Sequence, residues 1–197
     1  MPLLITMLAM TLLAGLGAAL VVGTMTETAV AAAYGQASAA FYAADAAIEF
    51  AIRDLAMQAD WDEVLSGAQT SMLVDGAPAG SRHIGVTVID LERATGEVEA
   101  LLAARAAPPA GPPRLYAFGR FDDLIAPIEA EAAAYLCVWV AEQPPEGQAD
   151  PPVRLLYVVG RAFGPTGGRR TVLVTMARPL DPDELAPIQV RSWEEPD

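Results

Sequence analysis

The sequence predicts an α+β protein in which a long N-terminal helix packs on a C-terminal antiparallel β-sheet. Two observations lead to this fold class. No proline interrupts the chain from Leu3 to Ala77 and residues 1–26 carry no charge, which favours a long helix whose first half spans a membrane. Four segments rich in β-branched and aromatic residues follow in the second half of the chain, which favours a sheet.

The composition argues against nucleic-acid binding and against enzymatic chemistry. The 197 residues carry a net charge of −13, from 25 acidic and 12 basic residues, and every base is an arginine. An acidic surface repels phosphate groups, and the only adjacent bases are Arg169 and Arg170. Cys137 and His83 are each the single residue of their kind. We therefore expect no zinc site, no cofactor, no enzyme activity and no small-molecule substrate.

The N-terminal segment has the length of a transmembrane helix. The apolar run from Leu3 to Val22 would extend about 30 Å as a helix, which matches the hydrocarbon core of a bilayer. Thr6 and Thr11 can donate to carbonyls one turn earlier. The alternative is a cleaved secretory signal, for which Ala37-Ser38-Ala39 resembles a cleavage site. The apolar run is longer than a signal core, so we expect residues 1–26 to be retained as the transmembrane half of the helix.

The distribution of basic residues sets the expected topology. The first base is Arg53, so no positive charge holds the C-terminal side of the helix in the cytoplasm. We expect a single pass through the inner (cytoplasmic) membrane, with the C-terminal domain outside the cytoplasm.

Residues 27–66 are expected to continue as an extracytoplasmic amphipathic helix. One face carries apolar residues at helical spacing: Phe41, Ala44, Ile48, Ile52 and Leu55. We predict one nearly continuous helix over residues 3–57, with bends at Gly23 and Gly35, and we expect its apolar stripe to pack beneath the sheet. Asp60 and Glu63 have the spacing of a capping box, which predicts a short helix that ends at Gly67, with Trp61 as a packing residue.

Residues 67–178 are expected to form the α+β sheet domain. His83–Asp90 alternates with period two and predicts one strand, and Leu91–Ala107 predicts a helix that ends at the proline-rich connector 108–113. The four predicted strands of the sheet are Arg114–Arg120, Tyr135–Glu142, Val153–Phe163 and Arg170–Arg178.

The last two of these strands flank the glycine-rich segment 164–168, which predicts a hairpin at the centre of a three- or four-stranded sheet. Cys137 lies in an alternating run and is expected to be a buried, inert residue, the other reading being a disulfide between two chains. Residues 179–197 are acidic and rich in proline and predict an extended tail.

Two sets of acidic residues are candidate calcium ligands. Asp122 and Asp123 follow a strand, and a proline-rich loop carries Glu142, Glu146 and Asp150. The loop lacks the dense alternation of Asp and Asn that calcium loops have, so turns and helix caps explain both groups better.

The segment after the membrane helix carries a family motif. Ala40-Phe41 and Ala43-Ala44-Asp45-Ala46 match the Ala-Phe-x-Ala-Ala-Glu-Ala pattern of the N-terminal domain of PilX-type minor pilins, with Asp in place of Glu. Glu27 lies where that family often has an acidic residue. Over residues 1–66 the chain resembles type IV pilin-like proteins, which share the long helix and antiparallel sheet.

The resemblance implies a minor pilin or pseudopilin that takes part in assembly, priming or tip capping of a type IV pilus or related pseudopilus. Its partners would be membrane lipid and other pilins, bound through the N-terminal helix. Glu27 would make a polar contact near the membrane exit. The residues implied in helix packing and in the filament interface are Phe41, Ala44, Asp45, Ile48, Ile52 and Leu55.

The first residues depart from the pilin pattern. Prepilins have a basic leader and a Glu five residues into the mature chain, whereas residue 5 here is Ile5. If Met1 is the mature terminus, the chain suits a tip or priming subunit, which has no subunit ahead of it to receive a carboxylate. If Met1 is not the mature terminus, residue 5 of this chain does not correspond to the fifth residue of a mature pilin.

Two other function classes stay open. A membrane-tethered periplasmic binding domain outside any filament would have a concave pocket in the sheet domain. A tethered enzyme would have clustered titratable groups, which the sequence does not favour.

Overall fold

The structure is a computed structural model that describes residues 2–58, 60–124, 134–144, 153–179 and 188–196. The chain divides into two compact units, Met1–Ser38 and Ala39–Asp197, here called the N-terminal unit and the globular unit. The division falls within the long helix, and the expected end of the transmembrane half at residue 26 stays a prediction.

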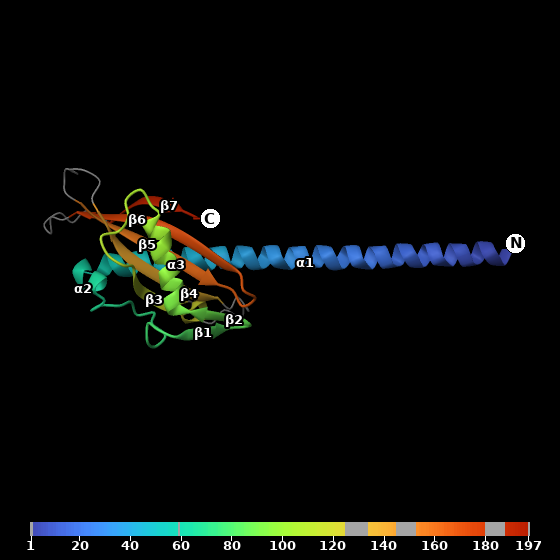
Figure 1. The fold of residues 1–197 in the computed structure, drawn as a ribbon, viewed down its shortest axis with the longest axis horizontal. Helices are drawn as coiled ribbons and strands as arrows, with labels where there is room; N and C mark the ends of the chain where they lie inside the picture. Colours follow the sequence, from blue (N-terminus) through green and yellow to red (C-terminus); the bar gives the residue numbers. More distant parts are fainter. Residues whose placement is uncertain (1, 59, 125–133, 145–152, 180–187, 197) are drawn as a thin grey trace. The chain divides into compact units, whose positions relative to one another are not determined.

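Helix α1 runs from Pro2 to Met57 without interruption (Figure 1). The predicted continuous helix is therefore confirmed. Gly23 and Gly35 both lie in regular helix, although we expected bends there. A glycine in a helix interior costs about 1 kcal/mol relative to alanine, but unlike proline it keeps its N–H donor and leaves the hydrogen-bond ladder intact.

The short helix α2 (Trp61–Ser66) follows, as predicted. Asp60 caps it by accepting a hydrogen bond from the N–H of Asp62 at 2.7 Å, rather than from that of Glu63. Gly67 ends the helix with φ of 81°, a conformation that favours glycine. Trp61 is buried, and its indole N–H donates to the carbonyl of Leu55 at 3.1 Å.

The main sheet has five antiparallel strands in the order β3-β4-β5-β6-β7. They are β3 (Arg114–Arg120), β4 (Tyr135–Gln143), β5 (Val153–Phe163), β6 (Arg169–Pro179) and β7 (Gln189–Glu194). The four predicted strands are confirmed to within one residue at either end. Strands β5 and β6 form the predicted hairpin, with Phe163 opposite Arg169, and β5 lies at the centre of the sheet.

Strand β7 corrects our expectation of three or four strands followed by an extended tail. It pairs with β6, so that Thr175 lies opposite Ser192 and Leu173 opposite Glu194. Its side chains are exposed or half-buried because it is an edge strand. The strong apolar alternation that marks the inner strands is therefore missing from its sequence.

A two-stranded hairpin replaces the single strand predicted over His83–Asp90. It consists of β1 (Ser81–Ile84) and β2 (Thr87–Asp90), with Ile84 opposite Thr87. The turn depends on Gly85, which has φ of 55° and a Cα so close to Pro165 that a Cβ would lie 2.5 Å from the carbonyl oxygen of Pro165. The N–H of Val86 donates to that same oxygen at 2.9 Å, which ties the hairpin to the β5–β6 turn.

Helix α3 (Leu91–Ala103) begins where predicted and ends four residues early. Asp90 caps it by accepting from the N–H of Arg93 at 2.8 Å. The chain leaves the helix at Ala104 and runs on toward the prolines, so residues 104–107 belong to the connector.

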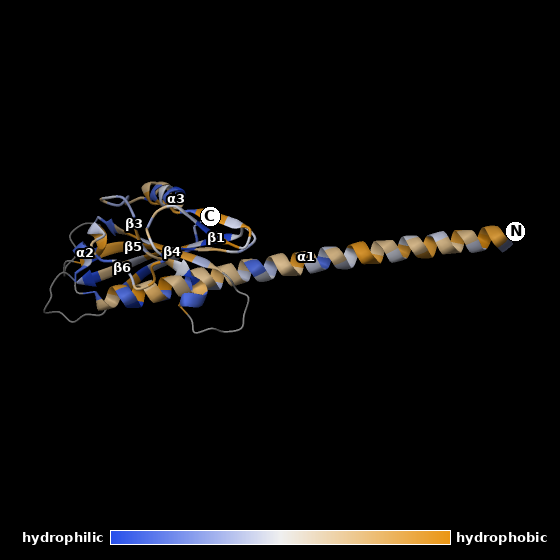
Figure 2. Cartoon of the chain, turned by 90° about the horizontal axis from the view of Figure 1, so that it is seen from below, coloured by the Kyte–Doolittle hydropathy of each residue, from blue (hydrophilic) through white to orange (hydrophobic). Residues whose placement is uncertain are grey.

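The sheet separates two clusters of buried apolar side chains, because consecutive residues of β4 point to opposite faces. Leu136, Val138 and Val140 pack against the globular unit's part of α1. Tyr135, Cys137 and Trp139 pack on the side of α3 and the β1–β2 hairpin. Figure 2 shows α3 on one side of the sheet and the C-terminal part of α1 on the other. The globular unit is thus a three-layer α/β/α arrangement around a sheet buried on both faces.

Candidate membrane and partner interface

The surface of α1 in the N-terminal unit is apolar and uncovered. Every residue from Pro2 to Gln36 is exposed, and residues 1–26 have no charge. Figure 2 shows apolar residues along this part of the helix. Among the described residues, α1 is the one helix long and apolar enough to cross a membrane. An apolar surface of this extent needs lipid or another apolar surface to cover it.

The hydroxyl groups along this surface are satisfied within the helix. Thr6 donates to the carbonyl of Leu3 and Thr11 to that of Leu8, each at 2.9 Å, as expected from the sequence. Further along, Thr24, Thr26 and Thr28 also donate to carbonyls one turn earlier. These bonds leave no threonine hydroxyl of this stretch unpaired in a bilayer.

Glu27 is the first charged residue of the chain and is exposed. It follows the apolar run directly, among the threonines at positions 24, 26 and 28. Its carboxylate therefore lies where the helix surface changes from apolar to polar, which is where the resemblance implies a polar contact.

The residues of the predicted apolar stripe differ in how far they are buried in the globular unit. Ala44, Ile48 and Leu55 are fully buried in the cluster between α1 and the sheet. They act in helix packing within the globular unit, and the filament role that the resemblance implies for them stays a prediction. Phe41, Asp45 and Ile52 are partly exposed.

The outward face of α1 in the globular unit carries a residue that sequence reasoning missed. Tyr42 is 67% exposed, and its ring meets that of Phe41 edge to face, with centroids 5.8 Å apart. Glu49, Arg53 and Met57 are also exposed on this helix. The helical spacing of the buried stripe could have marked Tyr42 as lying outside it, since it is neither three nor four residues from Ile48.

The C-terminal end of α1 is held by polar contacts that the sequence did not reveal. Asp54 is only 8% exposed and accepts a hydrogen bond from the Tyr116 hydroxyl at 2.9 Å. Burial and the neighbouring carboxylate raise the pKa of Tyr116, so its hydroxyl stays protonated as the donor. Arg178 donates to the carbonyl of Gln58 at 2.8 Å and lies over the ring of Trp61. The bond from Arg178 satisfies a backbone carbonyl that the helix end leaves free.

Two ion-pair groups join the helices to the sheet. Arg154 on β5 contacts Asp62 on α2 and Glu142 on β4, and its hydrogen bond lowers the pKa of Asp62. On the other face, Glu97 on α3 accepts from Arg161 at 2.9 Å and from Arg169 at 2.7 Å. Arg161 is buried, with its guanidinium 5.8 Å from the centre of the Trp139 ring. These contacts hold α2 and α3 in place against the sheet of the globular unit.

The other candidate residues lie apart from one another. Cys137 is buried as predicted, and burial raises the pKa of its thiol. His83 is exposed on β1. Asp122 and Asp123 are exposed in the turn after β3, and Glu142 is engaged with Arg154. Glu146 and Asp150 lie outside the described residues. Within the described part of the chain, no three His, Cys, Asp or Glu side chains are grouped as a metal site.

Comparisons of the chain with protein-family models, with curated proteins and with solved structures gave no match.

Proposed function

We propose that this protein is a pilin-like subunit, anchored in the membrane by α1, that takes part in assembling a type IV pilus or related pseudopilus. One observation supports this most strongly. A single helix is exposed over residues 2–36, carries no charge before Glu27, and from Ala40 onward forms one side of the core of the globular unit.

The exposed part of α1 suits both a bilayer and a filament. In lipid, the apolar side chains from Leu3 to Val22 contact acyl chains, and the hydroxyls of Thr6 and Thr11 donate to carbonyls of the helix itself. In a filament, the same side chains can pack against the equivalent helices of neighbouring subunits. The small residues Gly15 and Gly17, where a Cβ would meet nothing within 4 Å, permit close helix approach. The subunit can therefore pass from one environment to the other without refolding its globular unit.

The surface left on α1 supplies candidate contacts to other subunits. Phe41 and Asp45 belong to the motif that resembles PilX-type minor pilins, and both stay partly exposed. Tyr42 adds an exposed aromatic ring beside them. We assign these residues of the globular unit to partner contacts, and we assign Glu27 of the N-terminal unit to a separate polar contact.

The proposal is tested by single-cysteine crosslinking in sheared filaments. Because Cys137 is buried, a cysteine introduced at Val30 would be the reactive one. We expect Val30→Cys to crosslink to other filament subunits, whereas Arg114→Cys, on the exposed start of β3, does so far less. Confinement of the protein to the cell membrane, with none in sheared filaments, would overturn the proposal.

The same preparation separates a tip subunit from a shaft subunit. A tip or priming subunit is present in far fewer copies than the major pilin, as measured by quantitative mass spectrometry. Copy numbers comparable to those of the major pilin would exclude the tip role. N-terminal sequencing of the membrane form would show whether Ile5 is the fifth residue of the mature chain.

A further inference from the structure

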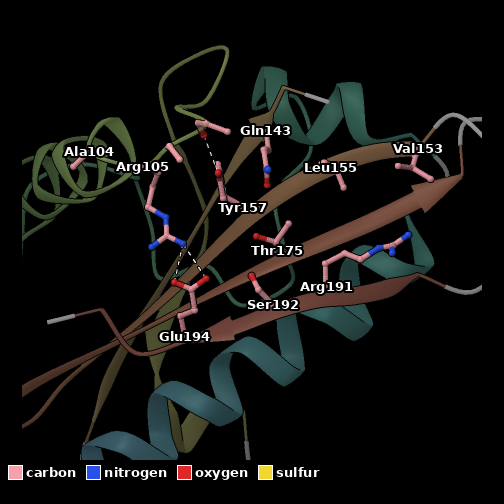
Figure 3. Close-up of a pocket in the computed structure, with 12 residues that line it drawn as sticks. Ala104, Arg105, Gln143, Val153, Leu155, Tyr157, Thr175, Arg191, Ser192 and Glu194 are labelled. Carbon is pink, nitrogen blue, oxygen red and sulfur yellow. Dashed lines mark hydrogen bonds and ion pairs between the residues drawn. The ribbon is translucent and has the colours of Figure 1, made fainter. Parts of the chain in front are cut away.

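A cleft of about 610 Å³ opens on the α3 side of the sheet, beyond the C-terminal end of α3 (Figure 3). Its wall is the connector Ala104–Ala107, and its floor is formed by strands β4 to β7. It arises because α3 ends at Ala103 and leaves this part of the sheet face without a helix. The volume lies within the range of about 300–1,000 Å³ that is typical of ligand sites.

The floor of the cleft contains a buried acceptor that lacks a donor. Gln143, at the end of β4, is 7% exposed and lines the cleft. Among the buried side-chain oxygen and nitrogen atoms of the described residues, Oε1 of Gln143 is the one without a hydrogen-bond partner. Figure 3 shows this side chain directed into the cleft. Leaving a buried acceptor unpaired is costly, so the position favours an occupant with an N–H or O–H donor.

Of the described arginines that line the cleft, one has no ion-pair partner. Arg105 from the wall and Glu194 from β7 neutralise each other, with Nη2 2.7 Å from Oε2. Arg191 on β7 is exposed and forms no ion pair within the described part of the chain. In a protein with a net charge of −13, an unpaired guanidinium beside a cleft is a specific feature that favours a carboxylate.

The rest of the lining is mixed in character. Val153 and Leu155 offer apolar contact, and the hydroxyls of Thr175 and Ser192 can donate or accept. The Tyr157 hydroxyl donates to the carbonyl of Ala107 at 2.8 Å, which fixes the wall against the floor. The cleft is therefore held open by its own contacts.

We propose that this cleft binds a short peptide with a free carboxylate. A peptide N–H would donate to Gln143 Oε1, the carboxylate would pair with Arg191, and a small apolar side chain would contact Leu155. Phosphate groups fit less well because, among the described residues that line the cleft, Arg191 is the single cation without an ion-pair partner. This binding activity is independent of membrane anchoring and of the filament role.

The test uses the full chain in detergent micelles and two probes, acetyl-Ala-Leu-Ala with a free carboxylate and the same peptide as its C-terminal amide. Binding is measured by calorimetric titration. We expect saturable binding of the acid, and binding of the amide weaker by roughly tenfold, which corresponds to the loss of one charge-assisted hydrogen bond. The absence of saturable binding of the acid, or equal binding of the two peptides, would overturn the proposal.

Three variants locate the binding. Arg191→Gln should weaken binding of the acid by roughly tenfold. Arg114→Gln, the matched change of an exposed arginine away from the cleft, should leave it unchanged. Gln143→Leu should weaken binding and also raise the melting temperature of the free protein, because it removes the unpaired acceptor. Arg191 is exposed, so its variant keeps the fold, and unchanged binding by Arg191→Gln would place the peptide elsewhere.

Discussion

Ile48 and Gly160 show how closely α1 approaches the sheet. A Cβ at Gly160 would lie 2.6 Å from Cγ1 of Ile48 and 3.2 Å from the carbonyl oxygen of Ala44. Strand β5 therefore accepts α1 only because it has no side chain at this point. Ile48 fills the resulting space completely, whereas Ile52, one turn later, lies at the edge of the same cluster.

We predict that Ile48→Ala destabilises the globular unit by about 2–5 kcal/mol, because it leaves a cavity that the close-packed sheet cannot fill. Ile52→Ala is the matched control and should cost clearly less, since Ile52 is partly exposed. Unfolding can be followed by the fluorescence of the buried Trp61 and Trp139. Equal losses in the two variants would contradict the packing described for α1.

Glu97 predicts a pH dependence of stability. Burial acts to raise the pKa of Glu97, but the charges of Arg169 and Arg161 and the hydrogen bonds from Arg161 and Arg93 outweigh it, so this pKa lies below its ordinary value of 4.5. The group binds a proton more readily in the unfolded chain, so its contribution is complete at neutral pH. It is lost as the pH falls below 4.5 through the lower, folded-state pKa.

We therefore expect Glu97→Gln to lower the melting temperature at pH 7, because it leaves the buried Arg161 without its counter-charge. The difference from the wild type should shrink when the pH is lowered from 5 to 3, a range of about two units around the ordinary pKa. Arg93→Gln removes the exposed partner of Glu97 and serves as the control, with little effect. A constant difference across this pH range would show that Glu97 acts by packing alone.

At the scale of elements, β7 covers the long strand β6 and itself becomes the edge, which is shorter and carries the charged residues Arg191 and Glu194. Without it, β6 would present a row of unpaired backbone N–H and C=O groups to solvent, and such edges promote association between chains. Strand β7 also carries Glu194, the partner of Arg105 beside the cleft. This late segment of the chain thus completes both the sheet and one side of the cleft.

We predict that a chain truncated after Pro179 aggregates when purified in detergent, as judged by size-exclusion chromatography. A chain truncated after Glu195, which keeps β7 whole, should elute like the full-length protein. A monodisperse profile for the shorter chain would mean that the edge of β6 needs no cover.

The membrane role of α1 is tested within the element itself. We expect Leu13→Arg, near the middle of the apolar run, to oppose insertion by roughly 2.5–3.5 kcal/mol. The protein should then become extractable from membranes at alkaline pH. Val30→Arg, on the exposed surface beyond the run, is the control and should stay membrane-bound. Wild-type retention of Leu13→Arg would show that lipid does not cover this surface.

For the whole molecule, the prediction is that the globular unit lies outside the cytoplasm. Met72 is 95% exposed, so Met72→Cys should react with a membrane-impermeant maleimide added to intact spheroplasts. The wild type provides the blank, because Cys137 is fully buried and burial raises the pKa of its thiol. Labelling of Met72→Cys only after lysis would place the globular unit in the cytoplasm.

Local sequence patterns were sufficient to predict an element where one residue type strongly favours one conformation. The absence of proline predicted the continuous α1, Asp60 and Gly67 predicted both ends of α2, and β-branched runs predicted β3 to β6. Gly85 could likewise have predicted a turn, but the alternating residues on both sides of it are typical of one continuous strand. Only the close contact of Gly85 with Pro165 in the structure explains the turn.

The sequence by itself determined the α+β class, the apolar helix and the inner strands, because period and composition act over a few residues. Tertiary structure alone decided which stripe residues are buried and that a weakly patterned segment becomes β7. It also decided that Gln143, Arg191 and the end of α3 meet at one cleft. These outcomes depend on contacts between residues distant in the chain, such as Arg105 with Glu194 and Asp54 with Tyr116. No local pattern predicts such pairs, because each partner, taken with its own sequence neighbours, is an ordinary polar residue.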